Sequence, residues 1–146
     1  MFKYLLVLLA LSVPSTANAD RYFLLFSATW CAPCKVVKQT VTRPEMANLI
    51  TQYDDNLLVD IDLSPKWKEF YQVKNIPTIM IVDLKTVDGK LVGNPKPVFK
   101  WVYGEGDAAL KSGLQKHLPK PVAKPRRPLL KLLKNPADFL KISLDK

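Results

Sequence analysis

The chain has 146 residues, a formal net charge of +9 and 48% hydrophobic residues. This length suffices for one domain with a core plus an appendage, and it excludes an array of several domains. The charge is unevenly spread, because residues 20–118 carry 13 Lys/Arg against 11 Asp/Glu whereas residues 119–146 carry 8 against 2. The basic excess belongs mainly to the last 28 residues, so it says little about the partners of the main domain.

The first 19 residues have the pattern of a secretory signal peptide. Lys3 precedes an apolar run from Leu5 to Val13, and residues 17–19 form an A-x-A cleavage site. The apolar run is about half of the ~20 residues that span a bilayer, which disfavours an uncleaved membrane anchor. We therefore expect cleavage after Ala19 and an exported protein, periplasmic or secreted, in which a disulfide is chemically permitted.

Residues 20–118 are predicted to alternate strands with helices. Apolar stretches without helical periodicity predict strands at residues 22–28, 56–62, 75–83 and 97–104. Helices are predicted from Ala32 to Ile50 with an interruption at residues 42–45, over residues 66–73, and over residues 106–118. Asp88-Gly89 is a hairpin-type turn signal. This order predicts an α/β fold with parallel pairing first and an antiparallel hairpin last.

The composition changes after Leu118. Residues 119–128 hold four prolines and four Lys/Arg, which is typical of an extended linker. Residues 129–146 place apolar residues near helical spacing, broken at Asn135-Pro136, and predict two short amphipathic segments. Basic residues beside leucines suit an anionic membrane surface, whereas nucleic acid is disfavoured as a partner because the tail has few aromatic residues. A disordered or loosely docked tail is the competing interpretation.

Cys31 and Cys34 are the only cysteines, three positions apart. A disulfide across so short a loop removes little entropy from the unfolded chain, which argues against a structural staple. A structural zinc site needs roughly four Cys or His ligands, and the single histidine, His117, lies about eighty residues away. We therefore expect no metal, and a redox pair is the favoured interpretation.

Cys31 falls where the first predicted strand gives way to a helix. The N-terminus of a helix presents free N–H groups and a partial positive charge, which favours thiolate over thiol and lowers the thiol pKa. Cys34 lies one turn into the helix, within reach of Cys31 but shielded by the helix. Cys31 is therefore predicted to attack as the nucleophile and Cys34 to resolve.

The segments FLLFSATWCAPCK and NIPT resemble the thioredoxin superfamily over residues 21–118. Within it, the chain is similar to exported thioredoxin-like domains such as the C-terminal domain of the thiol:disulfide interchange protein. The resemblance implies a thioredoxin-like fold, a β-α-β-α-β-β-α core lacking the family's first strand and helix, with extra residues around 85–97. It also implies that Pro77 follows a cis bond beside the cysteines, and that Trp30, Ile76 and Pro77 line the substrate groove. No cofactor is implied beyond the redox-active disulfide.

Three residues depart from the family's pattern. Leu25 stands where a buried carboxylate is usual, six positions before Cys31, and Leu58 stands where a lysine commonly faces that acid. Lys38 stands where the interchange-protein domain has an acid. A nearby cation lowers a thiol pKa and a nearby anion raises it, so Lys35 and Lys38 are expected to favour the thiolate. A stabilised thiolate stabilises the reduced form, which predicts a more oxidising couple.

The favoured hypothesis is an exported thiol:disulfide oxidoreductase that exchanges electrons with protein thiols and disulfides and with a separate, unidentified redox partner. The alternative is a redox-silent binding module with a thioredoxin fold and a membrane- or polyanion-binding tail.

Four other polar or aromatic residues are expected to have structural roles. Tyr103 is expected to pack, Asp60 and Asp62 to lie at a solvated strand edge, and His117 to lie beside a helix C-terminus, where it favours the dipole. The chain thus divides into a signal peptide (1–19), a thioredoxin-like domain (20–118), a linker (119–128) and a basic amphipathic tail (129–146).

Overall fold

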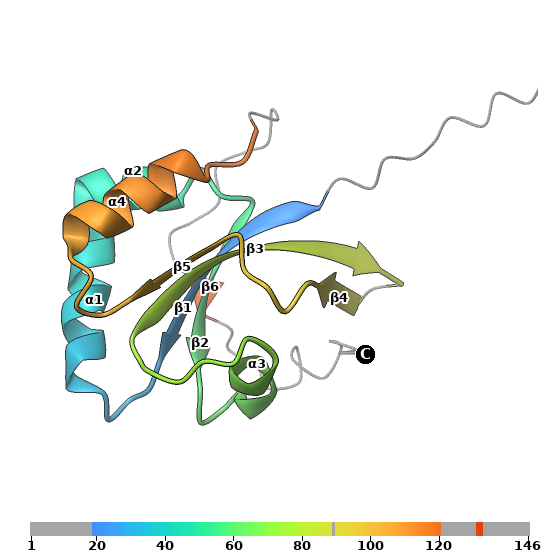
Figure 1. The fold of residues 1–146 in the computed structure, drawn as a ribbon, viewed down its shortest axis with the longest axis horizontal. Coiled ribbons are helices and arrows are strands. Elements are labelled where there is room, and N and C mark those ends of the chain that lie inside the picture. The colour runs from blue at the N-terminus through green and yellow to red at the C-terminus, as the bar shows by residue number, and fades with distance from the viewer. Residues whose placement is uncertain (1–18, 89, 121–130, 133–146) are drawn as a thin grey trace, which may run out of the picture.

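The computed structural model describes residues 19–88, 90–120 and 131–132 as one mixed sheet with helices on both faces (Figure 1). The strands are β1 (Asp20–Ser27), β2 (Asp55–Asp60), β3 (Thr78–Val87), β4 (Lys90–Gly93), β5 (Phe99–Val102) and β6 (Lys131–Leu132). The helices are α1 (Ala32–Thr42), α2 (Pro44–Ile50), α3 (Pro65–Phe70) and α4 (Asp107–Lys116). Within these described ranges no helix is both long and apolar enough to cross a bilayer. The expected signal peptide and most of the expected linker and tail lie outside the described residues.

β1 lies at the centre of the sheet, in the strand order β4-β3-β1-β2-β6. It runs parallel to β2, with Leu24 opposite Leu57, and antiparallel to β3, with Leu24 opposite Met80. β5 pairs antiparallel with β3. The predicted α/β fold, with parallel pairing first and antiparallel pairing last, is therefore confirmed.

Helices cover both faces of the sheet, so β1 is buried on both sides. Its side chains alternate between two hydrophobic clusters. Leu24 and Phe26 belong to the cluster that includes Trp67 of α3, whereas Phe23 and Leu25 belong to the cluster beneath α1, α2 and α4. A strand that is buried on both faces has no polar alternation, which explains the continuous apolar run at the start of the main domain.

The helix after the cysteines is broken where the sequence predicts. α1 ends at Thr42 and α2 begins at Pro44, and between them Arg43 is extended, with φ −61° and ψ 143°. The ring of a proline clashes with a helical residue before it, which forces Arg43 out of the helix. Pro44 itself occupies the first turn of α2, where its missing N–H costs no hydrogen bond.

The insertion around residues 85–97 forms a strand that the sequence analysis missed. β3 continues past its predicted end at Asp83 and turns at Asp88, whose φ of 50° is in the left-handed region. β4 then returns antiparallel along β3, with Lys85 opposite Val92. β5 pairs only with the N-terminal half of the same edge of β3, so the insertion satisfies backbone groups that β5 leaves without partners.

Two residues of the tail are described, and they form a strand instead of the predicted helical segment. β6 runs parallel to β2, with Leu57 opposite Lys131 and Leu58 opposite Leu132. Without β6, β2 would present a row of unpaired backbone N–H and C=O groups at the edge of the sheet. At residues 131–132, strand pairing with this row replaces the helix that the spacing of apolar residues predicts.

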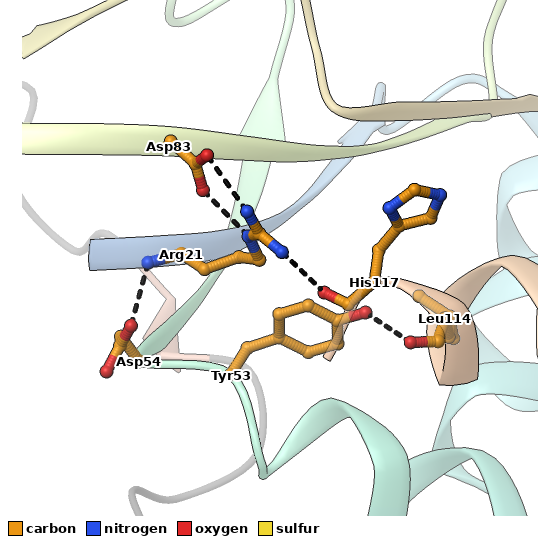
Figure 2. Close-up of polar contacts among 6 residues, drawn as sticks. All are labelled: Arg21, Tyr53, Asp54, Asp83, Leu114 and His117. Atoms are coloured by element: carbon orange, nitrogen blue, oxygen red, sulfur yellow. Dashed lines mark hydrogen bonds and ion pairs between the residues drawn. The ribbon is translucent and has the colours of Figure 1, made fainter. Parts of the chain in front are cut away.

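A cluster of polar contacts ties α4 to the sheet, at the end of β1 remote from the cysteines (Figure 2). The guanidinium of Arg21 donates to both carboxylate oxygens of Asp83, at 2.7 and 3.0 Å, and its Nη1 donates to the carbonyl oxygen of His117 at 3.3 Å. The hydroxyl of Tyr53 donates to the carbonyl oxygen of Leu114 at 2.7 Å. Hydrogen bonding to Asp83 raises the pKa of Arg21, and burial raises the pKa of Tyr53, so Arg21 stays charged and Tyr53 stays neutral around neutral pH.

Gly113 allows α4 to pack closely against the ring of Phe99. A Cβ at this position would overlap the ring, which stacks on the imidazole of His117 with the centroids 5.7 Å apart. We expect Gly113→Ala to lower the free energy of unfolding by roughly 1–3 kcal/mol, although alanine is the better helix former by about 1 kcal/mol. Urea titration measures the change.

The matched control for this prediction is Ser112→Ala, because Ser112 is exposed on the same helix. There the substitution should be neutral or slightly stabilising, since nothing opposes the helix propensity of alanine. A Gly113→Ala variant as stable as Ser112→Ala would contradict the close packing of α4 on Phe99.

Candidate active site

Cys31 and Cys34 form a disulfide at the start of α1, with their Cα atoms 5.3 Å apart. The backbone N–H of Cys31 donates to the carbonyl oxygen of Ala28 at 3.3 Å and closes the turn that follows β1. Cys31 has an extended backbone and is the N-cap of α1, and its Sγ accepts the backbone N–H of Cys34 at 3.2 Å. The structure therefore places both cysteines where the sequence predicts, while their separate roles remain predictions.

The charged residues of α1, the helix that Cys31 caps, are both cations. The first turn of α1 holds no acidic residue, and the N–H groups of that turn point toward the N-cap. Lys35 is exposed and Lys38 is half-buried on the same helix. Both cysteines are buried, Cys31 with 3% of its surface exposed and Cys34 with none, so the slight exposure at the pair belongs to Cys31.

The core beneath the cysteines is apolar at the two positions that depart from the family's pattern. Leu25 is fully buried in the cluster under α1, α2 and α4, and Leu58 packs against the edge of that cluster. The two leucines therefore contribute hydrophobic packing where a buried acid facing a lysine is usual. A buried charge without its partner would be strongly destabilising, so the loss of both charges together is physically consistent.

Pro77 lies beside the cysteine loop, immediately before β3. The Ile76–Pro77 bond is cis, as the resemblance predicts. Thr78 at the start of β3 pairs with Phe26 near the end of β1, so Pro77 lies at the end of the sheet from which the cysteine loop leaves. Ile76 packs against the hydrophobic cluster that contains both cysteines. The fold thus brings Ile76 and Pro77 together with Cys31 and Cys34.

Three exposed apolar residues lie on the loops at this end of the sheet, and we call them the apolar rim: Trp30, Leu63 and Tyr103. Trp30 is 68% exposed, and its Nε1 donates to Oδ2 of Asp62 at 2.8 Å. Leu63 follows Asp62 in the chain and is 69% exposed. The backbone N–H of Tyr103 donates to the carbonyl oxygen of Pro77 at 3.2 Å, while its side chain is half exposed.

Sequence analysis identified only Trp30 among the rim residues. Tyr103 was expected to pack, and Leu63 carries no local signal, because only the pairing of distant segments brings either residue to the cysteine end of the sheet. Asp62 was expected at a solvated edge; it is exposed there, and it also orients the indole of Trp30. Asp60 accepts the backbone N–H groups of Asp62 and Leu63 and stabilises the turn between them.

His117 lies outside the site, at the C-terminal end of α4, as the sequence predicts. Burial, together with the positive charges of Lys116 and Arg21, lowers its pKa below the ordinary value. A lowered pKa weakens the interaction of a charged imidazole with the helix dipole, and the ring also stacks on Phe99. In the described ranges of the chain, no group of three or more His, Cys, Asp or Glu residues is arranged to hold a metal ion.

A strand leads into a Cys-x-x-Cys pair at a helix N-terminus, and a cis-proline lies immediately before the neighbouring strand. On an α/β fold this arrangement can support dithiol–disulfide exchange. The chain belongs to the thioredoxin family, whose sequence model matches residues 14–100. It is 31% identical over 98 residues to the mitochondrial thioredoxin-3 of Saccharomyces cerevisiae, covering 66% of this chain and 65% of that protein. It is 39% identical over 72 residues to a thioredoxin of Staphylococcus epidermidis, covering 47% of this chain and 64% of that protein.

The chain thus spans slightly less than two thirds of the length of these curated relatives. Among solved structures, a thioredoxin from Thermus thermophilus superposes with a TM-score of 0.51 at 17% identity. The match covers 66% of this chain and 72% of that one. At this identity the likeness supports the fold alone.

The burial of the two cysteines predicts the order in which they react with an alkylating reagent. After reduction, Cys31 should be modified at least about tenfold faster than Cys34, because thiolate character and access both favour it. Mass spectrometry of the protein quenched at short times with iodoacetamide measures the two rates. Equal modification of the two cysteines would contradict the assignment of Cys31 as the accessible sulfur.

Proposed function

We propose that the protein is an exported thiol:disulfide oxidoreductase that exchanges electrons with the disulfides and thiols of other proteins through Cys31 and Cys34. The observation that carries this proposal is the position of Cys31 as the N-cap of α1, with Cys34 one turn behind it. The similarity to thioredoxins supports it. Export is proposed from the signal-like pattern of residues 1–19 alone.

The chemistry is a pair of thiol–disulfide exchanges. In the reducing direction, the Cys31 thiolate attacks one sulfur of the substrate disulfide, and the other substrate sulfur leaves as a thiolate. The Cys34 sulfur, as thiolate, then attacks Cys31 Sγ, which forms the Cys31–Cys34 disulfide and releases the second substrate thiolate. Two electrons pass from the cysteine pair to the substrate, and a separate redox protein must return the pair to its starting state. The reverse sequence oxidises a substrate dithiol, with the disulfide of the pair as the only cofactor.

The surface around the disulfide suits an extended apolar segment of a substrate protein. The apolar rim exposes two aromatic side chains and one leucine at the end of the sheet where the disulfide lies. Ile76 and Pro77 border the same site. Large apolar side chains that are exposed together mark contact surfaces for other proteins, so the rim is proposed to bind the chain on either side of the substrate disulfide.

The charges around the pair favour an oxidising couple. A leucine replaces the buried acid at position 25, and Lys35 and Lys38 add positive charge on α1. Each of these features favours the Cys31 thiolate over the thiol, and stabilisation of the reduced form makes the disulfide a stronger oxidant. We therefore propose a reduction potential above that of thioredoxins that retain the buried acid.

Trapping of mixed disulfides tests the proposed roles. The Cys34→Ser variant should accumulate mixed disulfides with substrate proteins, because the resolving sulfur is missing, whereas Cys31→Ser should accumulate almost none. Non-reducing electrophoresis followed by mass spectrometry measures the adducts. Equal trapping by both variants would overturn the roles, and trapping by neither would favour the alternative of a redox-silent binding module.

Titration of the reduced protein tests the electrostatic argument. The pKa of the Cys31 thiol should lie below that of a free cysteine, and Lys38→Glu should raise it because the substitution replaces a nearby cation by an anion. Lys111→Glu is the control, since Lys111 is exposed on α4 and the charge change is the same. Thiolate absorbance against pH measures the pKa. An equal response to the two substitutions, or a pKa at or above that of free cysteine, would contradict the argument.

A lowered thiol pKa also makes a prediction about stability. The reduced protein should become more stable as the pH rises through the pKa of Cys31, because the folded state then binds fewer protons than the unfolded state. The oxidised protein has no such term, since neither sulfur titrates. Urea titrations of both forms between about pH 5 and pH 9 measure the difference. A stability difference that does not change over this range would count against a depressed pKa.

We also propose that the tail of residues 119–146 binds an anionic membrane surface through its basic residues outside β6, because each basic residue near such a surface contributes about 1 kcal/mol. The tail variant replaces Lys124, Arg126, Arg127 and Lys134 by glutamine. The control variant replaces four exposed lysines of the main domain: Lys66, Lys68, Lys100 and Lys111. Co-sedimentation with vesicles of anionic phospholipid should be lost in the tail variant alone, with the redox activity of both unchanged. Equal loss in the two variants would contradict a specific role of the tail.

A further inference from the structure

Without β6, β2 would be an edge strand of the sheet. Residues 131–132 of the tail form β6 and pair with that edge. β6 runs parallel to β2 with a register that pairs Leu57 with Lys131 and Leu58 with Leu132. Seventy residues separate β6 from β2 along the chain, so this contact depends on the fold rather than on local sequence. β2 and β6 lie on one side of β1 in the sheet, and β3, which follows Pro77, lies on the other side.

The edge of β2 is the kind of edge that pairs readily with another strand. Leu57 belongs to the cluster on the α3 side, and Leu58 packs against the cluster on the other face. Both faces of β2 therefore carry apolar side chains in the middle of the strand. An uncovered apolar edge strand is a template for pairing with another chain, and the tail strand removes that exposure.

Charge selects the tail over a second copy of β2 as the occupant. Four acidic residues flank the apolar middle of β2: Asp54, Asp55, Asp60 and Asp62. The tail carries 8 Lys/Arg against 2 Asp/Glu. Two β2 edges would bring like charges together, which is unfavourable, whereas the sequence of the tail carries charge of the opposite sign.

We propose that the edge of β2 is a docking site for the basic tail of the same chain, with Lys131 and Leu132 as the resident strand. Backbone pairing determines the register, and the attraction between the acidic flanks of β2 and the basic tail favours this occupant. Docking keeps the sheet edge closed and the protein monomeric, and salt weakens it by screening the charges. The proposal does not depend on the redox activity of the cysteines.

Hydrogen exchange of the full-length protein with proline substitutions tests this docking. In a parallel ladder alternate residues direct their N–H groups to the partner strand, so proline at one of the two β6 positions must remove a pairing donor. Lys131→Pro and Leu132→Pro are therefore made separately, and Leu140→Pro, in the same tail, is the control. At least one β6 variant should accelerate, by about tenfold or more, the exchange of those amides of β2 that point away from β1 and toward β6.

The amides of residues 23–25 and 79–81 serve as an internal reference, because β1 and β3 are central strands whose exchange should stay unchanged in every variant. Moderate salt should accelerate exchange in β2 of the unsubstituted protein relative to that reference. Dimers formed only by a β6 variant, detected by light scattering, would also support the proposal. Unchanged β2 exchange in both β6 variants, equal acceleration in Leu140→Pro, insensitivity to salt, or an unsubstituted protein that is already dimeric would overturn it.

Discussion

The hydrogen bond from the N–H of Cys34 to the sulfur of Cys31 is the interaction on which the proposed chemistry depends. It exists because β1 ends just before α1 begins, so the first cysteine falls on the N-cap. β1 is in turn fixed by pairing with β2 on one side and β3 on the other. The same arrangement that buries the apolar run of β1 on both faces therefore places the sulfur of Cys31 at the positive end of α1.

The apolar core has an electrostatic consequence for this sulfur. Leu25 is buried on β1, the strand that leads into the cysteine loop, so the core there adds no anion to oppose a thiolate. The charges that remain on α1 are the cations Lys35 and Lys38. An acid in the core would oppose the effect of a cation on the helix on the thiol pKa; in this chain position 25 is uncharged, so the lysines meet no such opposition from it.

The sequence alone predicted the elements whose signals are local. Apolar runs located β1, β2 and β3, and Pro44 located the break between α1 and α2. The cysteine spacing with the Ile76-Pro77 motif located the centre of the site. β4 was missed although its partner is the strand directly before it and Asp88-Gly89 signals a turn between the two. β6 and the rim residues Leu63 and Tyr103 were missed because each depends on a partner distant in sequence: the edge of β2, and the loops that meet at one end of the sheet. Local propensity does not report such partners, and for β6 it favoured a helix that strand pairing replaced.

The central claim is that stabilisation of the Cys31 thiolate makes this pair more oxidising than an ordinary thioredoxin. The most direct test is the reduction potential of the purified protein, from equilibration with glutathione buffers of known ratio and quantification of the Cys31–Cys34 disulfide. The account predicts a potential clearly above the value of about −270 mV that is typical of thioredoxin. A potential at or below that value would contradict it, because the helix N-terminus, the two lysines and the apolar core would then not have stabilised the reduced form.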